Sequence, residues 1–414
     1  MKIRKKLLIL IVISALALQG CAIFRDEYEV NLEVDTTSVG TTAESTTEPT
    51  GESAPETEPP APVIPYSDVS ITFTAAGDNL IHPNIYMEAA RRATAGEGYN
   101  FKPLYEEIAA EIEAADFAFI NQETLMADEA TFGVSGYPTF NSPQQLGDDL
   151  VTLGFDIVGI ANNHMLDKSA AGLKSTLDFW HTKPVTLLGA FYDDNDAMTI
   201  RTIEKDGVTI ALLSYTYGTN GISLPAGSEL NIPYISDERI TRELAEVEEM
   251  ADFTIVSVHW GEENTKEPTD EQRRLARLMA DGGADVILGH HSHTLLPLEW
   301  IDRDDGGRTL CAYSLGNLVS AMMYPENMVG GLLNFTVKGD GVGGLTVGDI
   351  SFTPTVFYYA MSHFNTHIYR LENYTDEIAA GHGTQIYGYT TTYEKAVTYL
   401  KRCFADEYLP EYLR

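Results

Sequence analysis

The sequence predicts an α/β fold built on a largely parallel β-sheet, and three observations support this prediction. Short, continuous apolar runs recur from about residue 67 onward, as expected for strands that are buried on both faces. Helical patterns, with apolar residues three or four positions apart, precede most of these runs. Polar residues follow the runs directly, at the strand end where open α/β sheets bind their ligands.

The predicted strands and helices alternate along the chain. Helical patterns at residues 103–114 and 143–153 precede the second and third strands, and two more, around residues 240–247 and 275–279, precede the fourth and fifth. Gly282 ends the last of these helices. The predicted strands are residues 69–76, 116–120, 155–160, 253–258, 286–288 and 310–314.

Antiparallel strands are predicted as well, from pairs of apolar runs that flank turn residues. The sheet is therefore mixed, or two sheets pack face to face. Residues 359–414 are predicted to form a helical C-terminal extension, and no chemistry is evident there. The paired runs are residues 200–203 with 208–214, 298–301 with 309–313, and 332–337 with 345–352.

The first twenty residues are predicted to be a signal peptide. A cationic start is followed by the apolar run 7–18, which is short for a membrane span, and then by Gly20 and Cys21. A small residue before cysteine is typical of a bacterial lipoprotein cleavage site, so Cys21 is expected to carry lipid. A plain signal peptide and an N-terminal anchor helix are the alternatives. We expect the mature chain to lie at the extracellular face of the bacterial cell membrane.

Residues 21–66 are predicted to be a disordered tether that begins at the lipidated cysteine. The stretch 36–65 is rich in Thr, Glu, Ser and Pro and has almost no large apolar residues, so it cannot bury enough surface to fold. The folded domain is then expected to span residues 67–358.

The chain is strongly acidic, with a formal net charge of −34. Removal of residues 1–20 takes away four cations and no anions, which gives −34 − 4 = −38. Such a chain repels nucleic acid and other polyanions at long range and suits bound divalent metals. The two cysteines beyond Cys21, Cys311 and Cys403, are interpreted as unpaired thiols in preference to a disulfide, and no thiolate metal site is predicted.

Histidines concentrate where strands end. Six of the ten histidines lie in these positions, and neutral imidazole together with carboxylate is the ligand set that Zn, Mn and Fe take without thiolates. The sequence therefore predicts a site for one or two divalent ions. The six are His82, His164, His259, His290, His291 and His293.

The first two strand-end motifs supply carboxylates. Asp78 follows the first strand, although an aspartate there also commonly caps a helix. His82 is a candidate ligand, supporting donor or substrate contact. Asn121 and Glu123 share one strand face by alternation, and the alternative for Glu123 is a loop carboxylate that binds nothing.

The third motif combines a candidate ligand with a candidate acid. The Asn163 carbonyl can bind a metal while His164 donates a proton to a leaving group. Asp167 can orient His164, or it can cap the helix predicted to start near Lys168.

The remaining motifs supply imidazoles. His259 follows a buried strand and is joined by Glu262. His291 and His293, two apart on a segment interpreted as extended, are expected to face the same way and chelate one ion, with His290 facing the other way. Asn317 is a candidate supporting or substrate-contacting residue.

Taken in order, GDNLIH, NQE, ANNHMLD, HWGEE, GHHSH and SLGN resemble the CapA family of poly-γ-glutamate capsule synthesis proteins. That family is similar to calcineurin-like metallophosphoesterases, and the resemblance covers roughly residues 69–358. It implies a four-layer α/β/β/α sandwich with mixed sheets and a di-metal site at the strand ends. The ligands that it implies are Asp78, Glu123, Asn163, His259, His291 and His293, with His164 as proton donor.

Two departures from the phosphoesterase pattern bear on activity. The usual Asp-x-His is Asp78-x-x-x-His82 here, and Glu123 stands where a bridging Asp is usual. One hypothesis is a metal-dependent hydrolase or transferase acting on an anionic envelope polymer, such as poly-γ-glutamate, or on a phosphoester. The other is a non-catalytic surface protein that binds or exports the polymer, beside a membrane-bound capsule synthase.

Overall fold

Two mixed β-sheets form the centre of the described chain, which comprises residues 65–96 and 98–414 of this computed structural model. In the first sheet β1 to β4 are parallel, whereas β12, β13 and β14 continue it in antiparallel fashion beyond β1. The short β11 pairs with β1 at one end of the sheet. The strands are β1 (Ser70–Asn79), β2 (Phe117–Gln122), β3 (Ile157–Gly159), β4 (Thr186–Leu188), β11 (Asn317–Val319), β12 (Val329–Gly339), β13 (Leu345–Tyr358) and β14 (His367–Arg370).

The second sheet has the strand order β5-β6-β7-β8-β10-β9. Its inner strands β6, β7, β8 and β10 are parallel, and the antiparallel strands β5 and β9 close the two edges. The strands are β5 (Arg201–Lys205), β6 (Val208–Thr216), β7 (Phe253–His259), β8 (Val286–His290), β9 (Leu298–Asp302) and β10 (Arg308–Ala312).

Apolar side chains from both sheets meet in the core between them. Phe73 and Phe119 of the first sheet face Ile255 and Leu288 of the second, and all four are buried. The outer face of the second sheet packs a separate apolar cluster against α7 (Asp237–Val247) and α8 (Asp270–Asp281). The strands with continuous apolar runs are buried on both faces, because the other sheet covers the inner face and helices cover the outer face.

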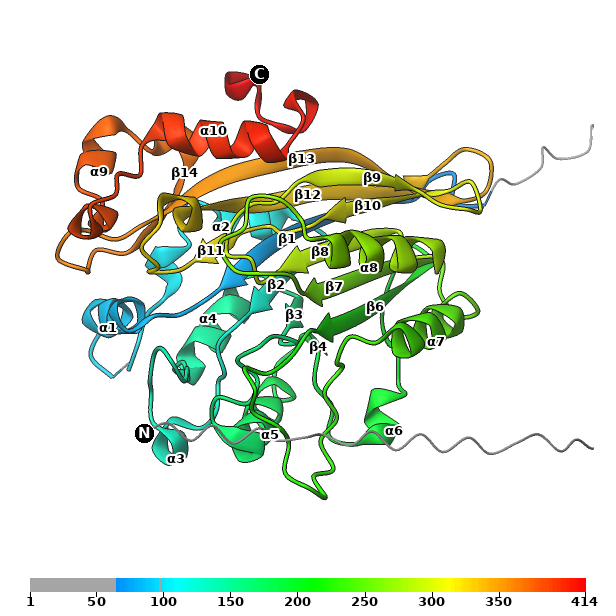
Figure 1. The fold of residues 1–414 in the computed structure, drawn as a ribbon, viewed down its shortest axis with the longest axis horizontal. Helices are drawn as coiled ribbons and strands as arrows, with labels where there is room; N and C mark the ends of the chain where they lie inside the picture. The colour runs from blue at the N-terminus through cyan, green and yellow to red at the C-terminus, as the bar shows by residue number, and fades with distance from the viewer. Residues whose placement is uncertain (1–64, 97) are drawn as a thin grey trace, which may run out of the picture. The chain divides into compact units, whose positions relative to one another are not determined.

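Further helices pack with the first sheet in one continuous core (Figure 1). The C-terminal part contributes through α10, whose C-terminal neighbour Phe404 stacks on Phe352 of β13 with ring centroids 4.1 Å apart. These helices are α1 (Pro83–Arg92), α2 (Ala109–Ala114), α4 (Gln144–Leu153), α5 (Ser169–Trp180), α9 (Asp376–Ala380) and α10 (Tyr393–Cys403). The one-turn helices α3 (Glu129–Phe132) and α6 (Asp194–Ala197) have no buried residue.

The predicted α/β class with two mixed sheets is confirmed. The sequence left open a mixed sheet or two sheets packed face to face. The structure has both features, since there are two sheets and each is mixed. The predicted helix at 103–114 is broken, because only Ala109–Ala114 is α-helical. Residues 359–414 contain the strand β14 as well as helices, and β14 extends the first sheet. Cys311 and Cys403 are buried and unpaired, which confirms the prediction of free thiols.

The predicted signal peptide and lipidation site, and the tether up to residue 64, lie outside the described residues. Within the part of the chain that the structure describes, no helix has the length and apolar character needed to cross a membrane. The described residues, from 65 onward, belong to one compact unit.

Candidate metal centre

The C-terminal ends of strands from both sheets meet at one edge of the molecule. Strands β1, β2 and β3 of the first sheet and β7 and β8 of the second end there (Figure 1). Apart from Asn317, the first residue of β11, the predicted site residues lie at the ends of these strands or in the loops that follow. Parallel strands place their carboxyl ends at the same edge, so residues far apart in sequence become neighbours.

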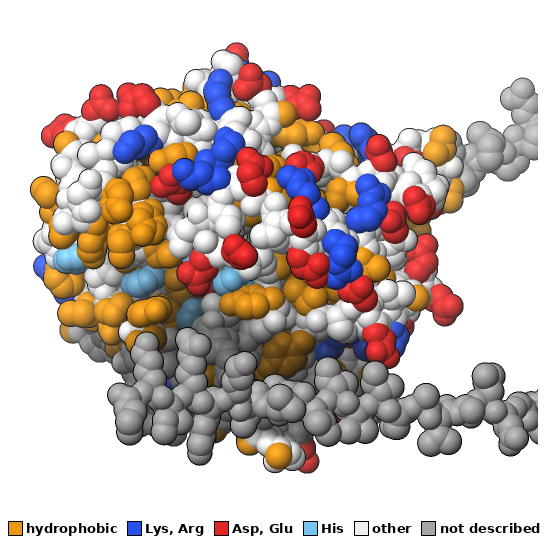
Figure 2. Space-filling model, viewed as in Figure 1, with side chains coloured by type: hydrophobic (Ala, Val, Ile, Leu, Met, Phe, Trp, Pro, Cys, Tyr) orange, Lys and Arg blue, Asp and Glu red, His pale blue; other side chains and the backbone are white. Residues whose placement is uncertain are grey.

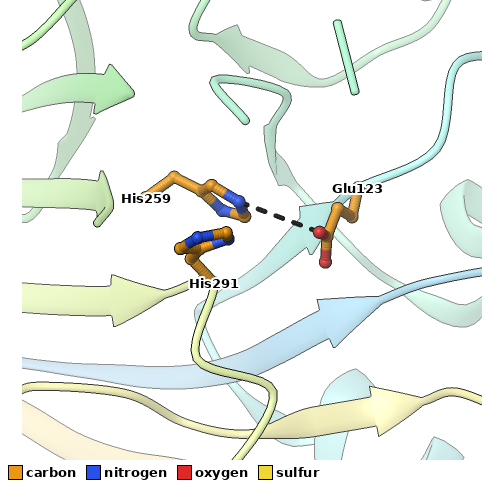
Figure 3. Close-up of side chains that lie close together, drawn as sticks. All are labelled: Glu123, His259 and His291. Atoms are coloured by element: carbon orange, nitrogen blue, oxygen red, sulfur yellow. Dashed lines mark ion pairs between the residues drawn. The ribbon is translucent and has the colours of Figure 1, made fainter. Parts of the chain in front are cut away.

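Five buried side chains form the centre of this site. Glu123, from the loop after β2, lies with its Oε1 3.7 Å from His259 Nε2 and 3.6 Å from His293 Nε2. Figure 3 shows Glu123, His259 and His291 pointing toward one another from different strand ends. Among the described residues, the triads whose ligand atoms lie within 4.8 Å of one another are Glu123–His259–His291, Asp78–Glu123–His293 and Glu263–His291–His293.

Glu123 is shared by two of these triads, and its environment fits a carboxylate that would hold metal. The side chain is fully buried, yet neither carboxylate oxygen has a hydrogen-bond partner among the described residues. A buried carboxylate without partners is costly, and buried polar groups in folded proteins are nearly always paired. Bound cations would satisfy both oxygens, so the donor set present fits divalent metal.

The electrostatics of the centre also favour bound positive charge. Burial raises the pKa of Glu123 well above its ordinary value, against the opposing charge of His293. Burial alone would lower the pKa of His293, but Glu123 and Asp78 raise it to about 10. Without a metal, a proton on His293 therefore supplies positive charge beside Asp78 and Glu123.

The other two imidazoles are held neutral. Burial, with the neighbouring His291, lowers the pKa of His259 well below its ordinary value. Burial and the charge of His293 lower the pKa of His291 to about 3. Neutral imidazole is the form that binds metal, so both rings are ready to act as ligands at physiological pH.

Asp78 is held in a ring of donors at the end of β1. Asn121 Nδ2 donates to its Oδ1 at 2.7 Å, and His290 Nδ1 lies 3.5 Å from the same oxygen. The His291 backbone N–H donates to Oδ2 at 3.3 Å, and His293 Nδ1 lies 3.2 Å from it. Burial alone would raise the pKa of Asp78, but hydrogen bonds from His290 and His293 lower it well below its ordinary value.

The segment that carries His291 and His293 is not extended, which corrects the geometry inferred from the sequence. Strand β8 ends at His290, and both following histidines have left-handed backbone, with φ of 89° for His291 and 55° for His293. Their rings nevertheless converge, with centroids 6.1 Å apart. Non-glycine residues in this region carry backbone strain, which is common at functional sites.

Asn317 supports His293 from a neighbouring strand. Strand β11 pairs with β1 so that Asn317 lies opposite Asp78, and the Asn317 Oδ1 lies 3.0 Å from His293 Nδ1. The Asn317 amide also donates to the backbone oxygens of His293 and Asn327, at 3.3 and 3.0 Å. Such contacts fix the orientation of a ligand imidazole.

Asn163 and His164 follow β3 and reach the same centre. The Asn163 Oδ1 lies 3.0 Å from His259 Nε2, which places this carbonyl beside the imidazoles. His164 Nδ1 lies 2.8 Å from the Asp167 Oδ2, and the same oxygen accepts the Phe140 backbone N–H at 2.7 Å. Asp167 makes no cap, because α5 has Lys168 at its N-cap position and no side-chain cap bond.

Glu262 belongs to none of the triads found among the described residues, and its supporting or substrate-contacting role stays a prediction. Both Glu262 and its neighbour Glu263 are exposed, but Glu263 belongs to a triad. The motif HWGEE contains both residues, but the turn after β7 decides which carboxylate faces the imidazoles. The loop is irregular, so no alternation of side chains predicts which of the two glutamates faces the imidazoles.

Two further residues were missed, and both follow β6. The Tyr217 ring lies 4.5 Å from the ring of His291, and the Asn220 Oδ1 accepts from Asn163 Nδ2 at 3.2 Å. Asn220 Nδ2 also lies 3.5 Å from His164 Nδ1. The rule that polar residues follow strands would have found this loop, had it been applied to the run 208–214 as well.

His82 lies beside the centre but in none of the triads found among the described residues. Its ring is edge-on to Phe140 at 5.4 Å, and Phe140 is edge-on to His164 at 4.8 Å. His290 packs its ring on Phe119 at 5.6 Å and contacts Asp78 from the core side.

The fold and this cluster define a two-sheet α/β protein with a histidine- and carboxylate-rich centre suited to metal. The chain belongs to the bacterial capsule synthesis protein PGA_cap family, whose model matches residues 72–322, more than half of the chain.

Two curated relatives are similar to this chain. The PGA biosynthesis protein CapA of Bacillus subtilis is 35% identical over 212 residues, covering 49% of this chain and 52% of that protein. The chain therefore spans about half the length of this relative. The capsule biosynthesis protein CapA of Bacillus anthracis is 26% identical over 298 residues, covering 70% of each.

Solved structures with a related arrangement are more distant. A putative 5'-nucleotidase of Staphylococcus aureus has a TM-score of 0.45 and 15% identity, covering 69% of this chain and 54% of that one. The calcineurin-like phosphoesterase YfkN of Bacillus subtilis has a TM-score of 0.41 and 13% identity, covering 69% and 90%.

Proposed function

We propose that this protein is a metal-dependent hydrolase or transferase of capsule synthesis. Its substrate would be an amide or phosphoester bond in an anionic envelope polymer such as poly-γ-glutamate. The observation that carries the proposal is Glu123, a fully buried carboxylate with two unpartnered oxygens that is shared by two triads of possible ligands. Membership of the capsule synthesis family and similarity to the two CapA proteins support the choice of polymer.

The proposed ligands bind one or two ions of Mn, Zn or Fe, because neutral imidazoles and carboxylates without thiolates suit these metals. When bound, such ions supply Lewis acidity toward a phosphoryl or acyl oxygen. They would also offset the repulsion between an anionic polymer and this acidic chain. The proposed ligands are Asp78, Glu123, Asn163, His259, His291 and His293.

His164 is the proposed general acid. Its Nδ1 donates to Asp167, so the opposite nitrogen is left to carry a proton to the leaving group. The Phe140 backbone N–H anchors the same Asp167 oxygen and keeps this carboxylate in place. Asp167 therefore sets the tautomer and direction of His164, as carboxylates beside catalytic imidazoles do.

We further propose that the protein is lipid-anchored through Cys21 at the outer face of the cell membrane, beside a membrane-bound capsule synthase. The cationic start, the apolar run and the cysteine after Gly20 support this placement. A tether of polar residues would let the metal centre reach a polymer that leaves the membrane.

The test combines metal analysis, turnover and capsule formation. The purified full chain, loaded with Mn²⁺ or Zn²⁺, is assayed against a panel of phosphoesters and γ-glutamyl amides. We expect wild-type turnover, and metal binding without turnover in His164→Ala. If Asn163→Ala and His164→Ala both bind metal and polymer and still support capsule formation, the protein is a non-catalytic polymer-binding component instead.

A further inference from the structure

Glu263, in the loop after β7, belongs to one of the three triads found among the described residues, although it is exposed. Its triad takes His291 from one of the buried triads and His293 from the other. All other members of the three triads are buried, so Glu263 approaches the centre from the solvent side. Figure 2 shows histidine side chains reaching the surface in a hollow, with acidic side chains close by. A solvent-facing carboxylate therefore lies beside histidines of both buried triads.

Hydrogen bonds attach the loop of Glu263 to the loop that carries the two histidines. The Asn264 backbone N–H donates to the oxygen of Ser292, the residue between the histidines, at 2.8 Å. One residue further along, the Thr265 oxygen accepts from the Thr294 hydroxyl at 2.6 Å. Backbone groups directly after Glu263 are therefore fixed to the histidine loop, which limits how far its carboxylate can move from the imidazoles.

The buried Asn327 joins the same two loops through its side chain. Its Nδ2 donates to the Asn264 Oδ1 at 2.8 Å and to the His293 backbone oxygen at 3.0 Å. One amide group thus holds the neighbour of Glu263 and a histidine of its triad together. The position of Glu263 beside the imidazoles follows from these bonds, and not only from the orientation of an exposed side chain.

The Glu263 carboxylate has no competing partner in the part of the chain that the structure describes. No described residue forms a hydrogen bond or ion pair with it, and Lys266, on the same loop, pairs with Glu326 at 3.6 Å. Its charge acts on the centre instead. Burial lowers the pKa of His293, and neighbouring carboxylates, Glu263 among them, raise it to about 10. The buried His291 has an Nδ1 without a hydrogen-bond partner among the described residues, so donor atoms remain available on both sides.

We propose that Glu263 is an additional metal ligand, which binds a divalent ion from the solvent side of the centre together with His291 and His293. A carboxylate and two imidazoles are a donor set that Zn, Mn and Fe accept. The inference rests on the metal centre of the proposed function and adds a ligand to it. The residues that follow Asp78 supply none, because Leu80 is apolar and His82 joins no triad among the described residues.

The test compares Glu263→Gln with Glu267→Gln. Both glutamates are exposed on the same loop, but Glu267 joins no triad among the described residues. Each substitution removes one negative charge and keeps the size of the side chain. The full chain is titrated with Mn²⁺ by calorimetry in about 0.15 M salt, where screening over about 8 Å weakens the effect of a distant charge. Visible absorption spectra of the Co²⁺-loaded proteins report the loss of a ligand, because the bands depend on coordination number and geometry.

We expect Glu263→Gln to bind Mn²⁺ about tenfold more weakly than wild type, and Glu267→Gln within about twofold. The Co²⁺ spectrum of Glu263→Gln should differ from that of wild type, whereas the spectrum of Glu267→Gln should coincide with it. Equal losses of affinity in the two variants, or a weaker Glu263→Gln with an unchanged Co²⁺ spectrum, would show an effect of charge alone and overturn the inference.

The remaining outcomes are also decisive. Unchanged Mn²⁺ binding in Glu263→Gln overturns the inference and leaves the buried metal centre intact. A wild type that binds no Mn²⁺ overturns the proposed function itself. Because Glu263 is exposed, the metal-free variant should have the melting temperature of wild type, so that a lost affinity reflects the site and not the fold.

Discussion

Carboxylates at the two ends of the same strands differ in how completely they are hydrogen-bonded. At the N-terminal ends, an aspartate immediately before each of β2, β3, β7 and β8 accepts a backbone N–H from the neighbouring strand. These bonds join Asp116 to Thr72 at 2.8 Å, Asp156 to Ala118 at 2.9 Å, Asp252 to Thr209 at 2.7 Å and Asp285 to Thr254 at 2.8 Å. Each of these carboxylates satisfies a backbone N–H of the neighbouring strand.

At the C-terminal ends the bonding is incomplete. Glu123 has no hydrogen-bond partner among the described residues, and one ring nitrogen each of His259 and His291 is also without one. Hydrogen bonding therefore separates carboxylates that stabilise the sheet from carboxylates that are available to a ligand. An acid that accepts a backbone N–H of the neighbouring strand stabilises the sheet, whereas a buried acid with no partner, such as Glu123, is a candidate for function.

Asp167 is the case that can break this comparison, because it lies at the site yet has both a ring and a backbone partner. We expect Asp167→Asn to reduce turnover by about 10²- to 10⁴-fold, since an amide no longer holds His164 in the acid-competent orientation. Mn²⁺ affinity should stay unchanged. Steady-state kinetics and calorimetric titration measure the two quantities, and unaltered turnover would assign Asp167 to the structural class.

Glu123→Gln tests the unsatisfied carboxylate directly. We expect Mn²⁺ affinity to fall by roughly 100-fold, because one substitution removes a ligand from both triads. The melting temperature of the metal-free protein should not fall, and should rise if the buried charge is the larger cost. Calorimetry and thermal unfolding give the two numbers. A destabilised protein that binds metal normally would mean that Glu123 belongs with the structural acids.

Asp285, at the N-terminal end of the strands, should make the free energy of unfolding depend on pH. Burial raises its pKa to about 6, against the Thr254 N–H and Arg303, so the folded state holds this proton more tightly than the unfolded chain. Its stabilising contribution is present below pH 4 and is lost as the pH rises through about 6. We expect wild type to lose about 2 kcal/mol relative to Asp285→Asn between pH 4 and 7.

Urea unfolding of both proteins at the two pH values measures this difference. An identical pH profile for wild type and Asp285→Asn would show that Asp285 titrates normally. Mn²⁺ affinity should not distinguish the two proteins, because Asp285 lies at the other end of β8 from the metal centre.

Asp156→Ala should have the smallest effect of these substitutions, and it concerns the free energy of unfolding. The half-buried carboxylate accepts one backbone N–H, from Ala118, and its loss should lower the free energy of unfolding by about 1 kcal/mol. Asp156→Asn keeps an acceptor and should cost less. Chemical denaturation measures both, and a loss of Mn²⁺ binding in either variant would contradict the separation between the two ends.

The sequence could predict the strand ends because burial on both faces leaves a continuous apolar run, and whatever follows the run lies at the sheet edge. Asp78, Glu123, His259 and His291 were found in this way, and they gather in the structure. Sheet order was not predictable in the same way, because β12 inserts next to β1 from more than two hundred residues away.

What remained hidden depends on loop geometry. Glu263, and not Glu262, belongs to a triad although both side chains are exposed, and Asn220 approaches Asn163 through a loop with left-handed backbone at φ 51°. Neither arrangement follows from an apolar pattern. The left-handed backbone of His291 and His293 likewise cannot be predicted from residue type, since such backbone is uncommon for any residue other than glycine.

The antiparallel pairing of β1 with β12 sets a practical limit on how this protein can be shortened. A fragment confined to the family-matched residues 72–322 would lack β12, so the amides and carbonyls of Thr72–Ala76 that now pair with Leu332–Thr336 would have an open edge. An uncovered central strand recruits other chains, so such a fragment should precipitate on expression rather than yield a soluble metal-binding domain.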